Sequence, residues 1–231
     1  MLHSLRYLSI LRILKKSGFS VGKHRIAEVG SGESGMSGYI GKSFIGCDIN
    51  FQGKPPERML PVRCSVFKLP FRDRSVDFVV SSDMMEHIPV EMREAAIIEM
   101  LRVTSRCLVL AFPEGEGARE CDTKVLRTLE ESKKKIPSWL SEHLEEKNKF
   151  PTAKEVSVIL DRIGLRYRVY SNENLLLHTL GVRLESNSVF KKLDWWTRKI
   201  PSHHLWKIVL PFVSMGRTYR SFFAVYCNER A

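Results

Sequence analysis

A glycine-rich turn and a nearby acid are the first residues of this sequence that could bind a ligand. Residues 26–35 read IAEVGSGESG, in which Gly30, Gly32 and Gly35 form a G-x-G-x-x-G pattern after an apolar run. Glycines at this spacing allow a tight turn and a close approach of the backbone to a nucleotide. Asp48 follows Gly30 by 18 residues, where a carboxylate can accept hydrogen bonds from both ribose hydroxyls. Together they predict a nucleotide site, without separating S-adenosylmethionine (SAM) from NAD.

Glu28, two residues before the first glycine, favours SAM. Dinucleotide enzymes usually carry a small or apolar residue at this place, whereas a carboxylate suits the cationic amine and sulfonium of SAM. A buried carboxylate without such a partner would be costly. The alternative is that Glu28 accepts hydrogen bonds from nearby backbone donors.

A second segment resembles a known family. Residues 69–88 read LPFRDRSVDFVVSSDMMEHI, which resembles the LPF-x-D-x-SFD-x-V-x-S-x-x-x-EH segment of class I SAM-dependent methyltransferases. The nearest branch is the methyltransferase type 11, or quinone-methylase-like, family. The resemblance covers about residues 24–114, where the glycine turn, the acid of the second strand and this segment follow in the family's order.

The resemblance implies a role for each matching residue. The residues expected to bind SAM are Glu28, Gly30 and Gly32 at its methionine part, with Ser31 and Gly35 in the same turn, Asp48 at the ribose, Ile49, Ser65 and Val66 at the adenine, and Ser82 and Asp83 near the methyl group. Two departures from the family pattern are visible: Gly35 comes one place late, and Ser65 replaces a frequent acid. His87 is the candidate general base, with a structural histidine as the alternative.

The elements that must position these residues alternate between strands and helices, as in a parallel α/β sheet. We predict a Rossmann-like doubly wound sheet, mostly parallel with an antiparallel last strand, and helical additions after the fifth strand and before the last. The predicted strands are 25–29, 43–48, 61–65, 76–82, 107–112, 165–170 and 219–227. The predicted helices cover 34–41, 89–103 and most of 118–163, with a capping box at Thr152 and Glu155.

One domain is expected over residues 1–231. Its core comprises about 24–114, 165–171 and 218–228, with helical insertions at about 118–163 and 172–217. The second insertion is expected to cover the site or to carry the acceptor, and the alternative is that it only packs on the sheet. Residues 1–17 predict an amphipathic helix with a basic face, which packs on its own domain or lies on a membrane surface.

The net charge of +11 is unevenly spread. Residues 1–25 carry six basic residues and no acid, and residues 181–220 carry eight basic against two acidic residues, a net of +6. Such regions attract phosphates, anionic membranes or nucleic acid, although a basic surface without a dedicated partner is the simpler reading. The five cysteines form no CxxC pair, which indicates reduced thiols in the cytoplasm and no metal site. No apolar run is long enough to span a bilayer.

The expected function is SAM-dependent methyl transfer to a small-molecule or lipid/glycan-linked acceptor. Residues 139–156, WLSEHLEEKNKFPTAKEV, resemble a stretch of family members encoded near cell-envelope or glycan genes, which favours such an acceptor. The alternatives are an NAD-dependent oxidoreductase, and a non-enzymatic SAM-fold module whose basic surface binds membrane or nucleic acid. A nucleic-acid acceptor ranks lower because no basic motif interleaved with aromatic residues is present.

Overall fold

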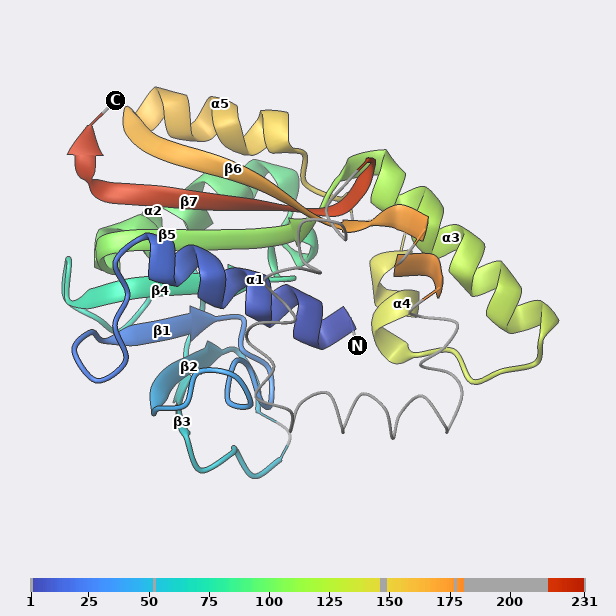
Figure 1. The fold of residues 1–231 in the computed structure, drawn as a ribbon, viewed down its shortest axis with the longest axis horizontal. Helices are drawn as coiled ribbons and strands as arrows, with labels where there is room; N and C mark the ends of the chain where they lie inside the picture. Colours follow the sequence, from blue (N-terminus) through green and yellow to red (C-terminus); the bar gives the residue numbers. More distant parts are fainter. Residues whose placement is uncertain (1, 52, 146–148, 177, 181–215, 231) are drawn as a thin grey trace.

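In the computed structural model, residues 2–51, 53–145, 149–176, 178–180 and 216–230 are described, and they form a seven-stranded sheet (Figure 1). The strands are β1 (Ile26–Val29), β2 (Phe44–Asp48), β3 (Met59–Arg63), β4 (Val76–Ser82), β5 (Thr104–Pro113), β6 (Leu165–Asn174) and β7 (Thr218–Arg230). Their order is β3-β2-β1-β4-β5-β7-β6. All seven predicted strands are therefore confirmed, with ends shifted by a few residues.

The sheet is parallel from β3 to β5, and β7 runs antiparallel to both of its neighbours, β5 and β6. This confirms the predicted mostly parallel sheet with an antiparallel last strand. The chain passes from β1 outward to β2 and β3, then returns to place β4 on the other side of β1. The carboxyl ends of β1 and β4 thus meet at the switch point, where open α/β sheets bind ligands.

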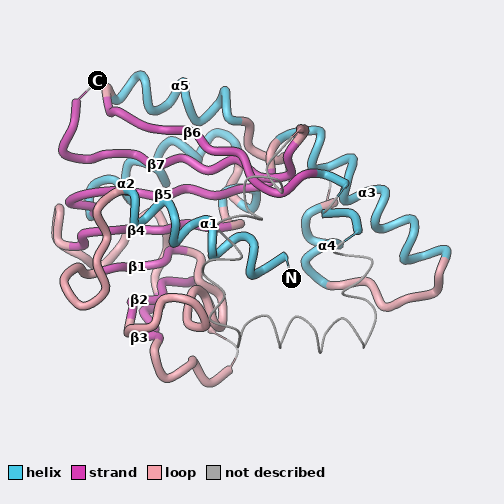
Figure 2. Tube along the Cα trace, in the orientation of Figure 1, coloured by secondary structure: helices cyan, strands magenta, loops and turns pink. Residues whose placement is uncertain are grey.

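Helices cover both faces of the sheet and its carboxyl edge (Figure 2). They are α1 (Leu2–Lys16), α2 (Arg93–Val103), α3 (Gly115–Glu131), α4 (Ser138–His143) and α5 (Ala153–Ile163), with short 3₁₀ turns η1 (Met85–His87) and η2 (Val90–Met92). Along β4, Phe78 and Val80 pack into the core that α1 covers, and Val79 into the core that α2 and α5 cover. This alternation explains why β4 is apolar throughout.

Helix α1 packs against its own domain. Tyr7, Ile10, Ile13 and Leu14 are buried and share one core with β1, β4 and β5. The apolar face that could have lain on a membrane is therefore covered by the sheet. Within the described residues, no helix combines the length and apolar character needed to cross a bilayer.

Two helix predictions need correction. Residues 34–41 form consecutive turns instead of the predicted helix. Three glycines, at 35, 38 and 41, explain this, because each one weakens a helix by about 1 kcal/mol relative to alanine. The helix expected from Pro89 begins as the 3₁₀ turn η2 and becomes α-helical only at Arg93.

The start of α5 matches half of the predicted capping box. The Thr152 hydroxyl accepts a hydrogen bond from the Glu155 backbone N–H at 3.1 Å. The Glu155 carboxylate does not return to Thr152 but pairs with the buried Arg93 of α2 at 3.0 Å. Gly164 ends the helix at φ 74°. Most of the predicted 172–217 insertion, residues 181–215, lies outside the described residues.

Candidate functional site

The glycine turn joins the carboxyl ends of β1 and β2. The backbone N–H groups of Gly30 and Ser31 donate to the Cys47 carbonyl at 2.8 and 3.1 Å. Gly30 has φ 77°, and a Cβ there would lie 2.7 Å from the Met84 side chain. A Cβ on Gly35 would collide with the Glu28 carboxylate. Both glycines are therefore required by the packing of the turn, whatever ligand it binds.

Asp48 ties the end of β2 to this turn. Its Oδ2 accepts from the Gly32 backbone N–H at 2.8 Å, and its Oδ1 accepts from the Asn50 backbone N–H at 3.1 Å. The carboxylate is half-buried, and each oxygen keeps one lone pair free for a further donor. Among the described residues, no atom lies within 4 Å of the position that a Cβ on Gly32 would occupy. An open space therefore faces the turn beside a carboxylate that can accept hydroxyl donors.

The predicted adenine and methyl-group residues lie at the same edge. Ile49, next to Asp48, is 72% exposed. Ser65 and Val66 follow the end of β3 and are half-buried. Ser82 ends β4 and is buried, and its hydroxyl has no hydrogen-bond partner among the described residues. The fold thus gathers all these positions along one edge, at the ends of four neighbouring strands.

Glu28 has two protein partners. It is fully buried, and its carboxylate accepts from the Tyr7 hydroxyl and the Met36 backbone N–H, both at 2.7 Å. Burial raises its pKa to about 7, against the hydrogen bond from Tyr7 and the charge of Arg6. The bond from Met36 is of the kind that the alternative named, a backbone donor, whereas the bond from the Tyr7 side chain was not foreseen. Its contact with SAM stays a prediction.

Asp83 is the centre of an ion-pair cluster at the end of β4. Its carboxylate accepts two hydrogen bonds from Arg220 of β7, at 3.0 and 2.8 Å, and pairs with Arg6 of α1. Arg220 also pairs with the buried Glu173 of β6.

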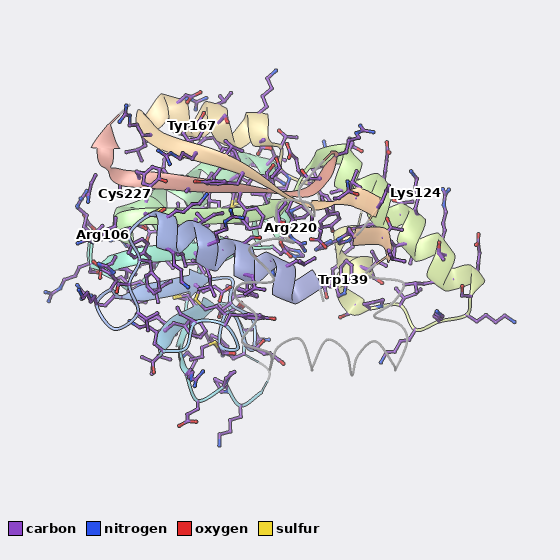
Figure 3. The ribbon with its side chains drawn as sticks, in the orientation of Figure 1. Arg106, Lys124, Trp139, Tyr167, Arg220 and Cys227 are labelled. Carbon is purple, nitrogen blue, oxygen red and sulfur yellow. The ribbon has the colours of Figure 1, made fainter. Side chains whose placement is uncertain are left out.

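Burial alone would raise the pKa of Asp83, but Arg220 and Arg6 lower it far below its usual range. Figure 3 labels Arg220 where the strands end. Asp83 is therefore ionised, with its charge compensated by two guanidinium groups.

The cluster continues as a buried network toward α3 and α4. Glu173 lies 2.9 Å from His178 Nδ1, and His178 Nε2 lies 3.6 Å from Asp122. The Asp122 carboxylate accepts from the Tyr219 hydroxyl at 2.9 Å and lies 3.1 Å from His143 Nδ1. Burial would lower the pKa of His178, but Asp122 and Glu173 raise it above its ordinary value. The sequence analysis did not identify this network, because its members come from α3, α4, β6, β7 and the segment after β6.

His87 ends η1 and is exposed. Partial burial of its ring and the neighbouring His143 lower the pKa of His87. The two imidazole rings have centroids 5.7 Å apart. A neutral imidazole near solvent is chemically able to accept a proton, and the role of general base stays a prediction.

Comparison with known proteins shows what this fold is similar to. Residues 27–107 match the model of the methyltransferase domain. The match begins in β1 and ends in β5, so it includes the glycine turn, Asp48, Ser82 and Asp83. No curated protein sequence matches the chain.

Solved structures share the fold of this chain at low sequence identity. Haemonchus contortus phosphoethanolamine N-methyltransferase 2, in complex with SAM, is 16% identical with a TM-score of 0.57, covering 94% of this chain and 52% of that chain. Magnesium protoporphyrin IX methyltransferase from Synechocystis, with bound S-adenosylhomocysteine, is 14% identical with a TM-score of 0.55 and covers 96% and 83%. A putative sarcosine dimethylglycine methyltransferase from Galdieria sulphuraria is 15% identical with a TM-score of 0.56 and covers 97% and 84%. The chain therefore spans about half the length of the nematode enzyme but most of the other two.

Proposed function

We propose that this chain transfers the methyl group of SAM to a small-molecule or lipid/glycan-linked acceptor. The observation that carries the proposal is the methyltransferase-domain match over residues 27–107, which contains the glycine turn held to Asp48 through the Gly32 N–H. The same match favours methyl transfer over the NAD-dependent oxidoreductase that the glycine pattern alone allowed.

The residues at the edge of the sheet fit SAM. Asp48 keeps free lone pairs for the ribose hydroxyls, and the exposed Ile49 offers an apolar surface for the adenine. The open space at Gly32 lets the ligand approach the backbone. The unpaired hydroxyl of Ser82 is a buried polar group that a ligand at this edge could satisfy.

Methyl transfer needs little covalent chemistry from the protein. SAM supplies an activated methyl group on a sulfonium, and the acceptor displaces it in line. The contribution of this chain is to position both molecules and exclude water, which can account for much of the acceleration. Asp83, held ionised by Arg220 and Arg6, would line the site near the methyl group. His87 would accept a proton only where the acceptor must lose one.

The proposed class of acceptor is supported by the positive charge of this chain. Residues 1–25 carry six basic residues and no acid, which supports an acceptor with phosphate groups, free or attached to a lipid or glycan. The same charge supports peripheral contact with an anionic membrane. The three structural neighbours are named for quite different acceptors, so their common fold does not favour any one of them.

Calorimetry with S-adenosylhomocysteine tests the cofactor. We expect Asp48→Ala to weaken binding about 100-fold, because two hydrogen bonds to a charged group contribute roughly 3 kcal/mol or more. Asp73→Ala is the matched control, because that carboxylate is 75% exposed and lies far along the chain from the glycine turn. Folded wild-type protein that gives no heat with S-adenosylhomocysteine, or that prefers NADH, would overturn the proposal.

Isotope transfer tests the acceptor. Labelled SAM is incubated with the protein and with fractionated lipid, glycan and aqueous extracts, and the labelled product is followed into the organic or aqueous phase. A labelled lipid- or glycan-linked product, or a labelled small molecule, supports the proposed class. Binding to anionic liposomes or RNA without any labelled product supports the non-enzymatic module instead.

A further inference from the structure

Three side chains that can ligate a metal meet beside the carboxyl edge of the sheet. Glu86 and His87 belong to η1, directly after β4, and His143 ends α4. One ligand atom from each lies within 4.8 Å of the other two. Figure 1 shows α4 next to the end of the sheet, which explains how residues 56 positions apart come together.

The Glu86 carboxylate is the most unusual group of the three. Its side chain is buried, and neither of its oxygens has a hydrogen-bond partner among the described residues. The nearest cationic candidate is His143, whose Nε2 lies 3.6 Å from Glu86 Oε1, too far for a hydrogen bond. A buried carboxylate without hydrogen bonds is costly unless it is protonated or bound to a cation. Among the described residues, a proton or a bound cation is therefore what this carboxylate lacks.

His143 is oriented so that Nε2 faces Glu86. Its Nδ1 lies 3.1 Å from Asp122 Oδ2, and this carboxylate also accepts from Tyr219. Because a carboxylate can only accept, Nδ1 carries the proton, and in the neutral ring Nε2 has the free lone pair. Trp139 and Phe150 hold the imidazole edge-on, each with a centroid distance of 5.3 Å. A carboxylate behind a histidine is the usual arrangement at metal-binding imidazoles.

We propose that Glu86, His87 and His143 bind a divalent transition-metal ion of the Zn²⁺ class. Two imidazoles and one carboxylate are a set that zinc takes with a fourth position left open, and they suit it better than Mg²⁺, which prefers oxygen ligands. Tetrahedral zinc places its ligand atoms about 3.3 Å apart. The Glu86–His143 pair is already at 3.6 Å, and a ring nitrogen of the exposed His87 lies within 4.8 Å of both partners.

The proposal departs from the expectation that this chain holds no metal. That expectation rested on cysteine spacing, and no cysteine takes part here. Metal binding at these residues does not depend on SAM binding. It would join η1 to α4 next to Asp83, and His87 would then be a ligand instead of a general base.

The test uses full-length protein without an affinity tag, treated with a chelator and titrated with Zn²⁺ or Co²⁺. We expect one ion per chain, a visible Co²⁺ absorption typical of four- or five-coordination, and a rise in melting temperature with the metal. Glu86→Gln and His143→Gln should each weaken Zn²⁺ binding at least 100-fold. His24→Gln is the control, because its ring lies in the segment between α1 and β1 and should leave binding unchanged.

Stability of the metal-free variants separates lost binding from lost folding. Glu86→Gln removes a buried carboxyl group with no partner, so the metal-free variant should melt no lower than metal-free wild type, yet gain nothing from Zn²⁺. If wild type, Glu86→Gln and His24→Gln bind Zn²⁺ equally, or folded wild type binds none, the proposal is wrong. Calorimetry with S-adenosylhomocysteine on the same metal-free samples shows independently whether the proposed methyltransferase function holds.

Discussion

Glu28→Gln should make the protein more stable at neutral and alkaline pH. Glu28 is fully buried, and its pKa rises from 4.5 to about 7 in the folded protein. Between these values the unfolded chain has released the proton that the folded chain retains. The free energy of unfolding therefore falls as pH rises, and the loss is complete above pH 7. Glutamine carries no proton to lose, so the variant escapes this penalty.

The size of the expected gain in unfolding free energy follows from the change in the pKa of Glu28. A difference of about 2.5 pKa units corresponds to about 3 kcal/mol. Glutamine can retain both hydrogen bonds, since its oxygen can accept from Met36 N–H while its amide donates to the Tyr7 hydroxyl. The gain in unfolding free energy should therefore approach 3 kcal/mol at pH 8 and vanish below pH 4.5.

Urea denaturation at intervals from pH 4.5 to 8 measures this difference directly. Glu94→Gln is the control: this glutamate is partly exposed and pairs with Arg162 at 2.9 Å on the surface, so its curve should stay within about 0.5 kcal/mol of wild type. If the Glu28→Gln and wild-type curves run parallel over the whole range, Glu28 does not titrate near 7 and the reasoning is refuted.

Three further substitutions test the packing around the site. Arg220→Met should lower the free energy of unfolding by about 3–5 kcal/mol in urea, because it removes the cation that two buried carboxylates share. A loss below about 1 kcal/mol would show that Arg6 and His178, their other partners, are sufficient. Gly30→Ala should lower the free energy of unfolding by about 2 kcal/mol and so lower the melting temperature, because φ is 77° and the new Cβ would collide with Met84. An unchanged melting temperature would contradict this prediction. Thr152→Ala should lower the free energy of unfolding in urea by about 1 kcal/mol, because the helix cap is lost. Thr152→Ser should retain most of this free energy, because serine keeps the hydroxyl.

The strands, and the place of the candidate site residues in the sheet, are predictable where the signal is local. β4 was predicted with its observed bounds, because a strand buried on both faces is apolar at every position. Asp48 and the glycines lie at strand ends, so their meeting at one edge follows from the order of the parallel strands. The helix predicted at 34–41 is not formed because the glycines in this segment disfavour a helix.

Partners that come from distant segments could not be predicted. Tyr7 reaches Glu28 from α1, and Arg6 reaches Asp83 across 77 positions of sequence. His143 meets Glu86 only because α4 lies against the end of the sheet. The sequence contains a Glu-His pair at 142–143, but the spacing between this pair and Glu86 does not indicate that His143 faces Glu86.

The position of β7 has a consequence for how the chain folds during synthesis. β7 fills the space between β5 and β6, and both of these strands are made first. Until β7 enters, β5 and β6 each present an unpaired edge to other nascent chains. The pairings that it brings are far apart in sequence, Cys107 with Tyr226 for example, and such contacts form slowly. A ribosome-bound chain that stops short of β7 is therefore a natural client for chaperones.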